Sequence, residues 1–99
     1  FLMKIRLNKK RVLAVLRQHS KELDSFGVKK IGLFGSYLHG SSAPLSDLDF
    51  LVEFRTNTFD NYMGLKFLLE RLFHKKVDLV IEKELKPAMR YVRKEAVYA

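Results

Sequence analysis

Apolar residues recur every three or four positions in two long stretches of the chain. In the first stretch Asn8 can cap a helix that begins near Lys9 and stops at Gly27. The second stretch starts at Asp60, which can cap another amphipathic helix. A closing helix is expected at Pro87, because proline fits the first turn of a helix.

Three shorter segments are rich in apolar residues and have the length of strands. They span 28–34, 48–54 and 77–81, and a helical turn over 36–39 and a loop over 41–44 are expected between the first two. The resulting order is helix, strand, loop, strand, helix, strand, helix. It predicts an α+β fold in which a small mixed sheet of about three or more strands packs against about four helices.

Length and composition favour a single domain that spans residues 1–99. The chain has 99 residues and 47% hydrophobic content, which suits one small core. It contains no cysteine, so disulfides and zinc-thiolate sites are excluded. No apolar run approaches the roughly 18 residues of a membrane span. We therefore expect a soluble cytoplasmic protein with no membrane partner.

The formal net charge is +8, and it comes from short basic clusters rather than from a continuous basic tail. These clusters lie near the ends of predicted elements, at 9–11, 29–30, 75–76 and 93–94. We assign them to the solvated surface and to recognition of a partner. Direct binding of nucleic acid is the alternative interpretation of the same charge.

The chemistry of the chain concentrates around two motifs. The pair Gly35-Ser36 ends the first predicted strand, and after ten further residues Asp47 and Asp49 flank Leu48 at the start of the second. On an extended chain both carboxylates project from one face, because alternate residues point the same way. A glycine turn lets the backbone approach a phosphate closely, and paired carboxylates suit Mg²⁺. The pattern predicts a site for a metal-bound nucleoside triphosphate.

Each motif also has an ordinary structural explanation when it is taken alone. Gly35-Ser36 could be a plain turn, Asp47 a cap, and Asp78 on the third predicted strand the partner of a nearby lysine. Asp49 weakens that interpretation, because a second acid in an apolar strand is costly to bury without a cation. Structural roles are expected for three further residues. Glu53 should be a surface or salt-bridging acid, and His19 and His74 should be structural rather than catalytic.

Together, the Gly-Ser pair, the ten-residue gap, the Asp-x-Asp pair and a later third acid form a signature. It resembles that of the minimal nucleotidyltransferases of the DNA polymerase β superfamily. The segment 33–54, LFGSYLHGSSAPLSDLDFLVEF, carries the signature, and 75–87, KKVDLVIEKELKP, resembles the strand with the third acid. Within this superfamily the chain is most similar to the MntA-type antitoxins, which are encoded beside a HEPN-domain toxin.

The resemblance implies a polymerase β-like nucleotidyltransferase fold and a set of site residues. The implied residues are Gly35, Ser36, His39, Gly40 and Ser46 for the nucleotide, and Asp47, Asp49 and Asp78 for the metal and catalysis. Asp78 would also orient or deprotonate the incoming hydroxyl. Ser46 could instead bond within its own loop. Many relatives carry Arg or Lys at the position of His39, and neutral histidine is a weaker phosphate ligand.

The resemblance also implies an activity. MntA-type antitoxins transfer AMP from ATP to a tyrosine of a HEPN-type RNase toxin, with Mg²⁺, two ions being the expected number. The short chain agrees with this, because the acceptor surface must then come from a partner. Two alternatives stay open: a binding module that neutralises the toxin by forming a complex, and an RNA-directed nucleotidyltransferase.

Overall fold

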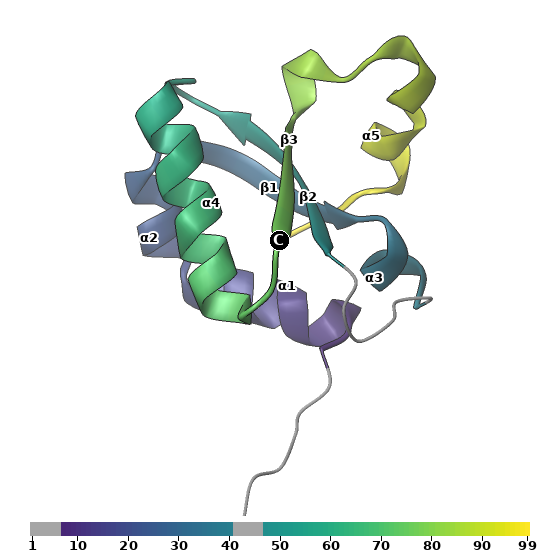
Figure 1. Cartoon of the computed structure of the whole chain (residues 1–99), viewed down its shortest axis with the longest axis horizontal. Coiled ribbons are helices and arrows are strands. Elements are labelled where there is room, and N and C mark those ends of the chain that lie inside the picture. The colour runs from purple at the N-terminus through teal and green to yellow at the C-terminus, as the bar shows by residue number, and fades with distance from the viewer. Residues whose placement is uncertain (1–6, 41–46) are drawn as a thin grey trace, which may run out of the picture.

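The computed structural model describes residues 7–40 and 47–99, whose elements form a four-stranded sheet with helices packed on it (Figure 1). The α-helices are α1 (Lys9–Gln18), α2 (Ser20–Ser25), α3 (Ser36–His39), α4 (Phe59–Phe73) and α5 (Tyr91–Glu95). The strands are β1 (Val28–Phe34), β2 (Leu48–Phe54), β3 (Val77–Ile81) and β4 (Val97–Tyr98). Two 3₁₀ turns, η1 (Glu82–Glu84) and η2 (Pro87–Met89), lie between β3 and α5.

The strands are arranged in the order β3-β2-β1-β4, and the sheet is mixed. β1 is antiparallel to both β2 and β4, whereas β2 and β3 run parallel. The parallel pair is connected through α4, since parallel strands need a crossover between them. The predicted α+β class and mixed sheet are confirmed, and the three predicted strands have the predicted bounds.

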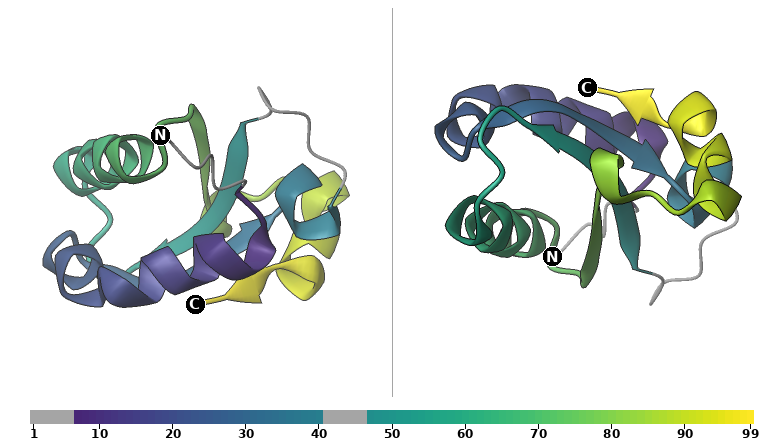
Figure 2. Two further views of the ribbon diagram at one scale, coloured as in Figure 1. Left: turned by 90° about the horizontal axis from the view of Figure 1, so that it is seen from below. Right: turned by 90° about the horizontal axis from the view of Figure 1, so that it is seen from above.

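Two apolar layers hold the helices to the sheet. On one face α1 and α4 cover the strands, with Leu16, Phe50 and Leu69 fully buried. On the other face Val92 of α5 packs with Phe34 and Leu51. Figure 2 shows α4 and α5 on opposite sides of the sheet. The second layer is the smaller one. On the same face of the sheet, Asp49 is half-buried and Asp78 is exposed.

The first predicted helix is interrupted. His19 has φ −109° and ψ 24°, outside the helical range, and it separates α1 from α2. Its ring Nδ1 lies 2.9 Å from the Val15 carbonyl oxygen, which its own backbone N–H also contacts. A side chain that competes for the same carbonyl disturbs the backbone ladder at this point. The prediction that the helix stops at Gly27 is confirmed, and Gly27 has φ +74°.

Three details of the second half also differ from the prediction. Thr58, and not Asp60, caps α4, because its hydroxyl accepts the Asn61 N–H at 3.1 Å. Pro87 begins the 3₁₀ turn η2, and the closing helix α5 follows it. The two-residue strand β4 had not been predicted.

No helix in the described part of the chain combines the length and the apolar character needed to cross a membrane.

Candidate active site

Gly35 stands where β1 passes into α3, and its backbone is one that only glycine adopts readily. It has φ +80° and ψ −154°. A Cβ atom at this position would overlap Oδ2 of Asp49 on the neighbouring strand. The glycine therefore brings the main chain directly against a carboxylate. Ser36, the first residue of α3, follows at the same point.

Asp49 and Asp78 are direct neighbours across the parallel pair β2 and β3. Their side chains project from the same face of the sheet, since paired residues of adjacent strands point the same way. Leu48 and Phe50 point to the opposite face and are fully buried. Asp47 lies one residue before β2 and is exposed. Asp78 and Asp49 therefore face the same way, as a shared metal site requires.

The three acids act on one another electrostatically. The pKa of Asp49 is raised to about 6, first because the side chain is partly buried and then because Asp78 and Asp47 lie nearby. Among the ion pairs of residues 7–40 and 47–99, none joins any of these three acids to a lysine, arginine or histidine. The alternative that Asp78 merely pairs with a nearby lysine is therefore not what the structure shows.

The donor set suits Mg²⁺ only in combination with another ligand. In the described ranges no three His, Cys, Asp or Glu side chains lie close enough together to enclose a metal ion. Mg²⁺ is usually bound by one or two carboxylates together with substrate phosphates and water. The carboxylates of Asp47 and Asp49 fit that pattern, because no ion pair within the described ranges joins them to a cation and Asp49 lies directly against the backbone of Gly35. A metal here would be completed by phosphate oxygens.

His39 ends α3 and lies beside α5. Its Nε2 atom is 3.4 Å from Oε2 of Glu95, and both side chains are exposed. Gly40 caps α3 in the left-handed conformation, with φ +72°. Ser46 lies outside the described residues. Of the expected nucleotide-binding residues, Gly35, Ser36, His39 and Gly40 therefore form one short segment next to Asp49.

The structure adds neighbours that the sequence alone had not connected with the site. Tyr37, which directly follows Ser36, has a buried ring. The Lys75 ammonium group lies 5.6 Å from the centre of that ring. The Lys76 carbonyl accepts the Leu48 N–H at 3.0 Å, which sets Lys76 beside the start of β2. Glu95 reaches His39 from 56 residues away. No local sequence signal could have revealed these long-range contacts, although the basic pair 75–76 had been noted for its charge.

The residues expected to be structural make structural contacts. Glu53 lies 3.5 Å from the Lys29 ammonium and 3.8 Å from that of Lys30, so it is a salt-bridging acid as predicted. His74 ends α4 in the left-handed conformation, and its N–H donates to the Glu70 carbonyl at 2.9 Å. His19 contacts the backbone of α1 as described above.

Comparison with known proteins places this geometry in a family. A family model described as "Nucleotidyltransferase domain" matches residues 16–98. The protein adenylyltransferase MntA of Thermococcus cleftensis is 40% identical over 88 residues, which cover 86% of this chain and 89% of that protein. MJ1379 of Methanocaldococcus jannaschii, named as a candidate protein adenylyltransferase, is 43% identical over 75 residues, 72% of this chain and 75% of that protein.

Solved structures agree on the fold. A minimal nucleotidyltransferase of 32% identity superposes with a TM-score of 0.73 and covers 95% of this chain and 98% of its own. A toxin–antitoxin complex with AMP-PNP gives a TM-score of 0.65 at 23% identity, over 93% of this chain and 72% of that one. The complex of a tri-AMPylated Shewanella oneidensis HEPN toxin with its MNT antitoxin gives 0.62 at 21% identity, over 88% and 70%.

Proposed function

Because the chain belongs to the nucleotidyltransferase domain family, we propose that it transfers AMP from Mg-ATP to a hydroxyl group of a partner protein. Relatives of 40% and 43% identity that bear the names of established or candidate protein adenylyltransferases support the choice of a protein acceptor. The proposed partner is a HEPN-type toxin, and the proposed acceptor is a tyrosine. The solved antitoxin complexes with the same fold support that partner.

One observation carries the proposal. Asp49 and Asp78 lie side by side on adjacent strands, Asp49 lies against Gly35, and among residues 7–40 and 47–99 no ion pair joins either carboxylate to a cation. Burial, and then the nearby charges of Asp78 and Asp47, raise the pKa of Asp49 and so disfavour its ionised form in the absence of a ligand. A fold tolerates such a group when a ligand relieves it, and perturbed carboxylates of this kind cluster at functional sites. A divalent cation with a triphosphate would provide that relief.

The residues divide the transfer between them. The backbone at Gly35 and Ser36 would hold the leaving end of the triphosphate, and Asp47 and Asp49 would hold Mg²⁺. When bound, Mg²⁺ neutralises charge on the phosphates and on the leaving group. Asp78 would accept the proton as the acceptor oxygen forms its bond to the α-phosphorus. The bond from the α-phosphorus to the bridging oxygen breaks, and pyrophosphate leaves.

The direct test is label transfer. The protein is incubated with Mg²⁺, ATP labelled at the α-phosphate and the proposed HEPN-type partner. We expect label on the HEPN protein, at a tyrosine located by mass spectrometry, and loss of its RNase activity. Asp47→Ala should abolish the label. Glu53→Gln is the matched control, because Glu53 is an acid of the same strand that is paired with lysines.

Two outcomes would overturn the proposal. Inhibition of the toxin without label, unchanged in Asp47→Ala, would show that the chain acts by binding alone. Label that appears on RNA instead of protein would show that the basic surface serves an RNA-directed transferase. An oligonucleotide and a tRNA are therefore included in the same assay.

A further inference from the structure

Helix α5 is anchored next to the acidic residues. Val92 is 1% exposed and packs against Phe34 and Leu51. Phe34 is the cross-strand neighbour of Asp49, and Leu51 lies two residues beyond Asp49 on the same face. Val92 therefore holds α5 on the same face of the sheet as Asp49, no more than two residues, or about 7 Å, away along the strand.

The other end of α5 contacts the segment that begins at Gly35 and Ser36, where the phosphates are proposed to bind. Glu95 contacts His39 at 3.4 Å, and His39 lies in the short helix that begins at Ser36. Tyr91 precedes Glu95 by four residues, so the two side chains lie on the same side of α5, one turn apart. A triphosphate at Gly35 and Ser36 would thus have α5 alongside the rest of the nucleotide.

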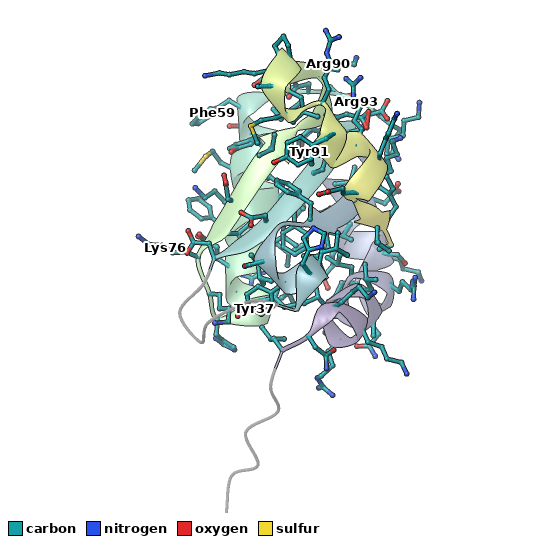
Figure 3. All side chains as sticks on the ribbon, turned by 90° about the vertical axis from the view of Figure 1, so that its right-hand side faces the viewer. Tyr37, Phe59, Lys76, Arg90, Tyr91 and Arg93 are labelled. Atoms are coloured by element: carbon teal, nitrogen blue, oxygen red, sulfur yellow. The ribbon has the colours of Figure 1, made fainter. Side chains whose placement is uncertain are left out.

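Tyr91 is a large side chain without an evident structural task. It is 57% exposed, although its neighbour Val92 is buried, and its hydroxyl makes no hydrogen bond in the described part of the chain. Within residues 7–40 and 47–99, the other strongly exposed aromatic residues are Phe59 and Phe67, which belong to α4 on the opposite side of the sheet. In Figure 3 Tyr91 lies in front of the strands, below Arg90 and Arg93.

We infer that the Tyr91 ring is the stacking platform for the base of the bound nucleotide, an inference that rests on the proposed function. The ring is an exposed flat apolar surface on α5, the helix that Val92 holds on the same face of the sheet as Asp49. Stacking on an aromatic side chain tolerates any base, since every base has a π-face. Tyr91 therefore raises affinity for nucleotides without selecting adenine over guanine.

The test separates the base from the phosphates. Dissociation constants are measured by calorimetry for Mg-ATP, Mg-GTP and Mg-tripolyphosphate. We expect Tyr91→Ala to weaken both nucleotides about 10-fold and to leave tripolyphosphate unchanged. Tyr91→Phe should bind like the wild type, because its ring is kept. Phe67→Ala is the matched control, since it removes an aromatic ring that is 60% exposed on the other side of the sheet.

Binding of both nucleotides by Tyr91→Ala as tightly as by the wild type would overturn the inference. An equal loss for nucleotides and tripolyphosphate would also overturn it, because the defect would then lie in the phosphate site. Failure of the proposed function looks different: the wild type itself would transfer no label, whatever the behaviour of Tyr91→Ala in binding.

A spectroscopic readout is available because the chain contains no tryptophan. Tyr91→Trp introduces a single tryptophan at the proposed platform, which can be excited selectively over the tyrosines, and Phe67→Trp introduces one on α4. We expect Mg-ATP to quench the emission of Tyr91→Trp, while Mg-tripolyphosphate leaves it nearly unchanged. The emission of Phe67→Trp should respond to neither ligand. Quenching of both variants by ATP, or of neither, would contradict a local stack at position 91.

Discussion

Two groups of acids lie on the same face of the sheet, one at each end, and they differ in their partners. At one end Asp49 adjoins Gly35, and Asp78 is its neighbour on the next strand. At the other end Glu53 follows Asp49 by four residues on β2, and Glu82 comes directly after β3. The apolar contact between α5 and the strands separates the two ends.

The acids at the far end are neutralised within the fold. Lys30 lies 3.8 Å from Glu53 and 3.7 Å from Glu82, and its ammonium group also lies 4.8 Å from the centre of the Tyr98 ring. The Tyr98 hydroxyl donates to Glu82 at 3.2 Å, which ties β4 to the end of β3. In the part of the chain that the structure describes, no ion pair joins the acids at the Gly35 end to a cation. Acids on the same face of a sheet can thus have different roles. Those in ion pairs with lysines stabilise the fold, whereas those without such pairs are candidates for binding a ligand.

The largest effect is expected when the close approach at the Gly35 end is removed. Gly35→Ala places a methyl group against the Asp49 carboxylate and strains a backbone at φ +80°. A displaced carboxylate or phosphate should lower the rate of AMP transfer by roughly 10²-fold, as misplacements of about 1 Å do. The rate is measured with labelled ATP and the partner protein.

Gly27→Ala is the control for backbone strain alone. Gly27 has a similar φ of +74°, but the nearest atom to its new methyl group would be the end of the Asn61 side chain, at 3.0 Å. Backbone strain should cost both variants about 1–2 kcal/mol of stability, and the overlap with Asp49 should add to the loss in Gly35→Ala; only Gly35→Ala should lose most of its activity. Equal activity losses at equal protein stability would mean that strain, and not the contact with Asp49, causes the defect.

Much of this site follows from local sequence patterns. The β1, β2 and β3 bounds were predictable because apolar runs of strand length are bounded by turn residues, and alternation placed Asp47 and Asp49 on one face. The signature added Asp78. The side chain of Asp78 could be placed next to Asp49 only once the register of two parallel strands was known, and register depends on packing across the whole sheet.

The remaining features depend on distant contacts or on weak local preferences. A two-residue strand such as β4 has too little pattern to be recognised, and it forms because β1 offers a free edge. The contact between Glu95 and His39 joins residues 56 positions apart. The break at His19 comes from a side chain that bonds to a carbonyl of its own helix, a competition that apolar spacing does not reveal.

The second prediction uses pH to distinguish the two groups of acids. The pKa of Asp49 is about 6 in the folded state and 3.8 in the unfolded chain. Between these values the folded state binds more protons, so the contribution of Asp49 to the free energy of unfolding falls as pH rises from about 4 to 6. Asp49→Asn should therefore be more stable than the wild type at pH 7.5 and close to it at pH 4. Urea unfolding at both values measures the difference.

Glu53→Gln should change the stability at pH 7.5 in the opposite direction to Asp49→Asn. It removes a charge that two lysines neutralise, so it should destabilise the protein at pH 7.5 by roughly 0.2–1 kcal/mol. A stabilising effect of both substitutions would mean that the two ends of the sheet face do not differ as described. Addition of Mg-ATP should stabilise the wild type at pH 7.5 more than it stabilises Asp49→Asn, since only the wild type keeps the proposed metal ligand.

The smallest effect is expected at Tyr98, which belongs entirely to the neutralised end. Tyr98→Phe removes the hydrogen bond to Glu82 and keeps the ring beneath Lys30. The loss should be about 0.5–1.5 kcal/mol in urea unfolding, because Glu82 keeps its ion pair with Lys30. AMP transfer should stay within about twofold of the wild type, since α5 remains anchored through Val92. A large loss of transfer without a loss of stability would mean instead that the far end communicates with the acids at Gly35, and that the two ends form one functional unit.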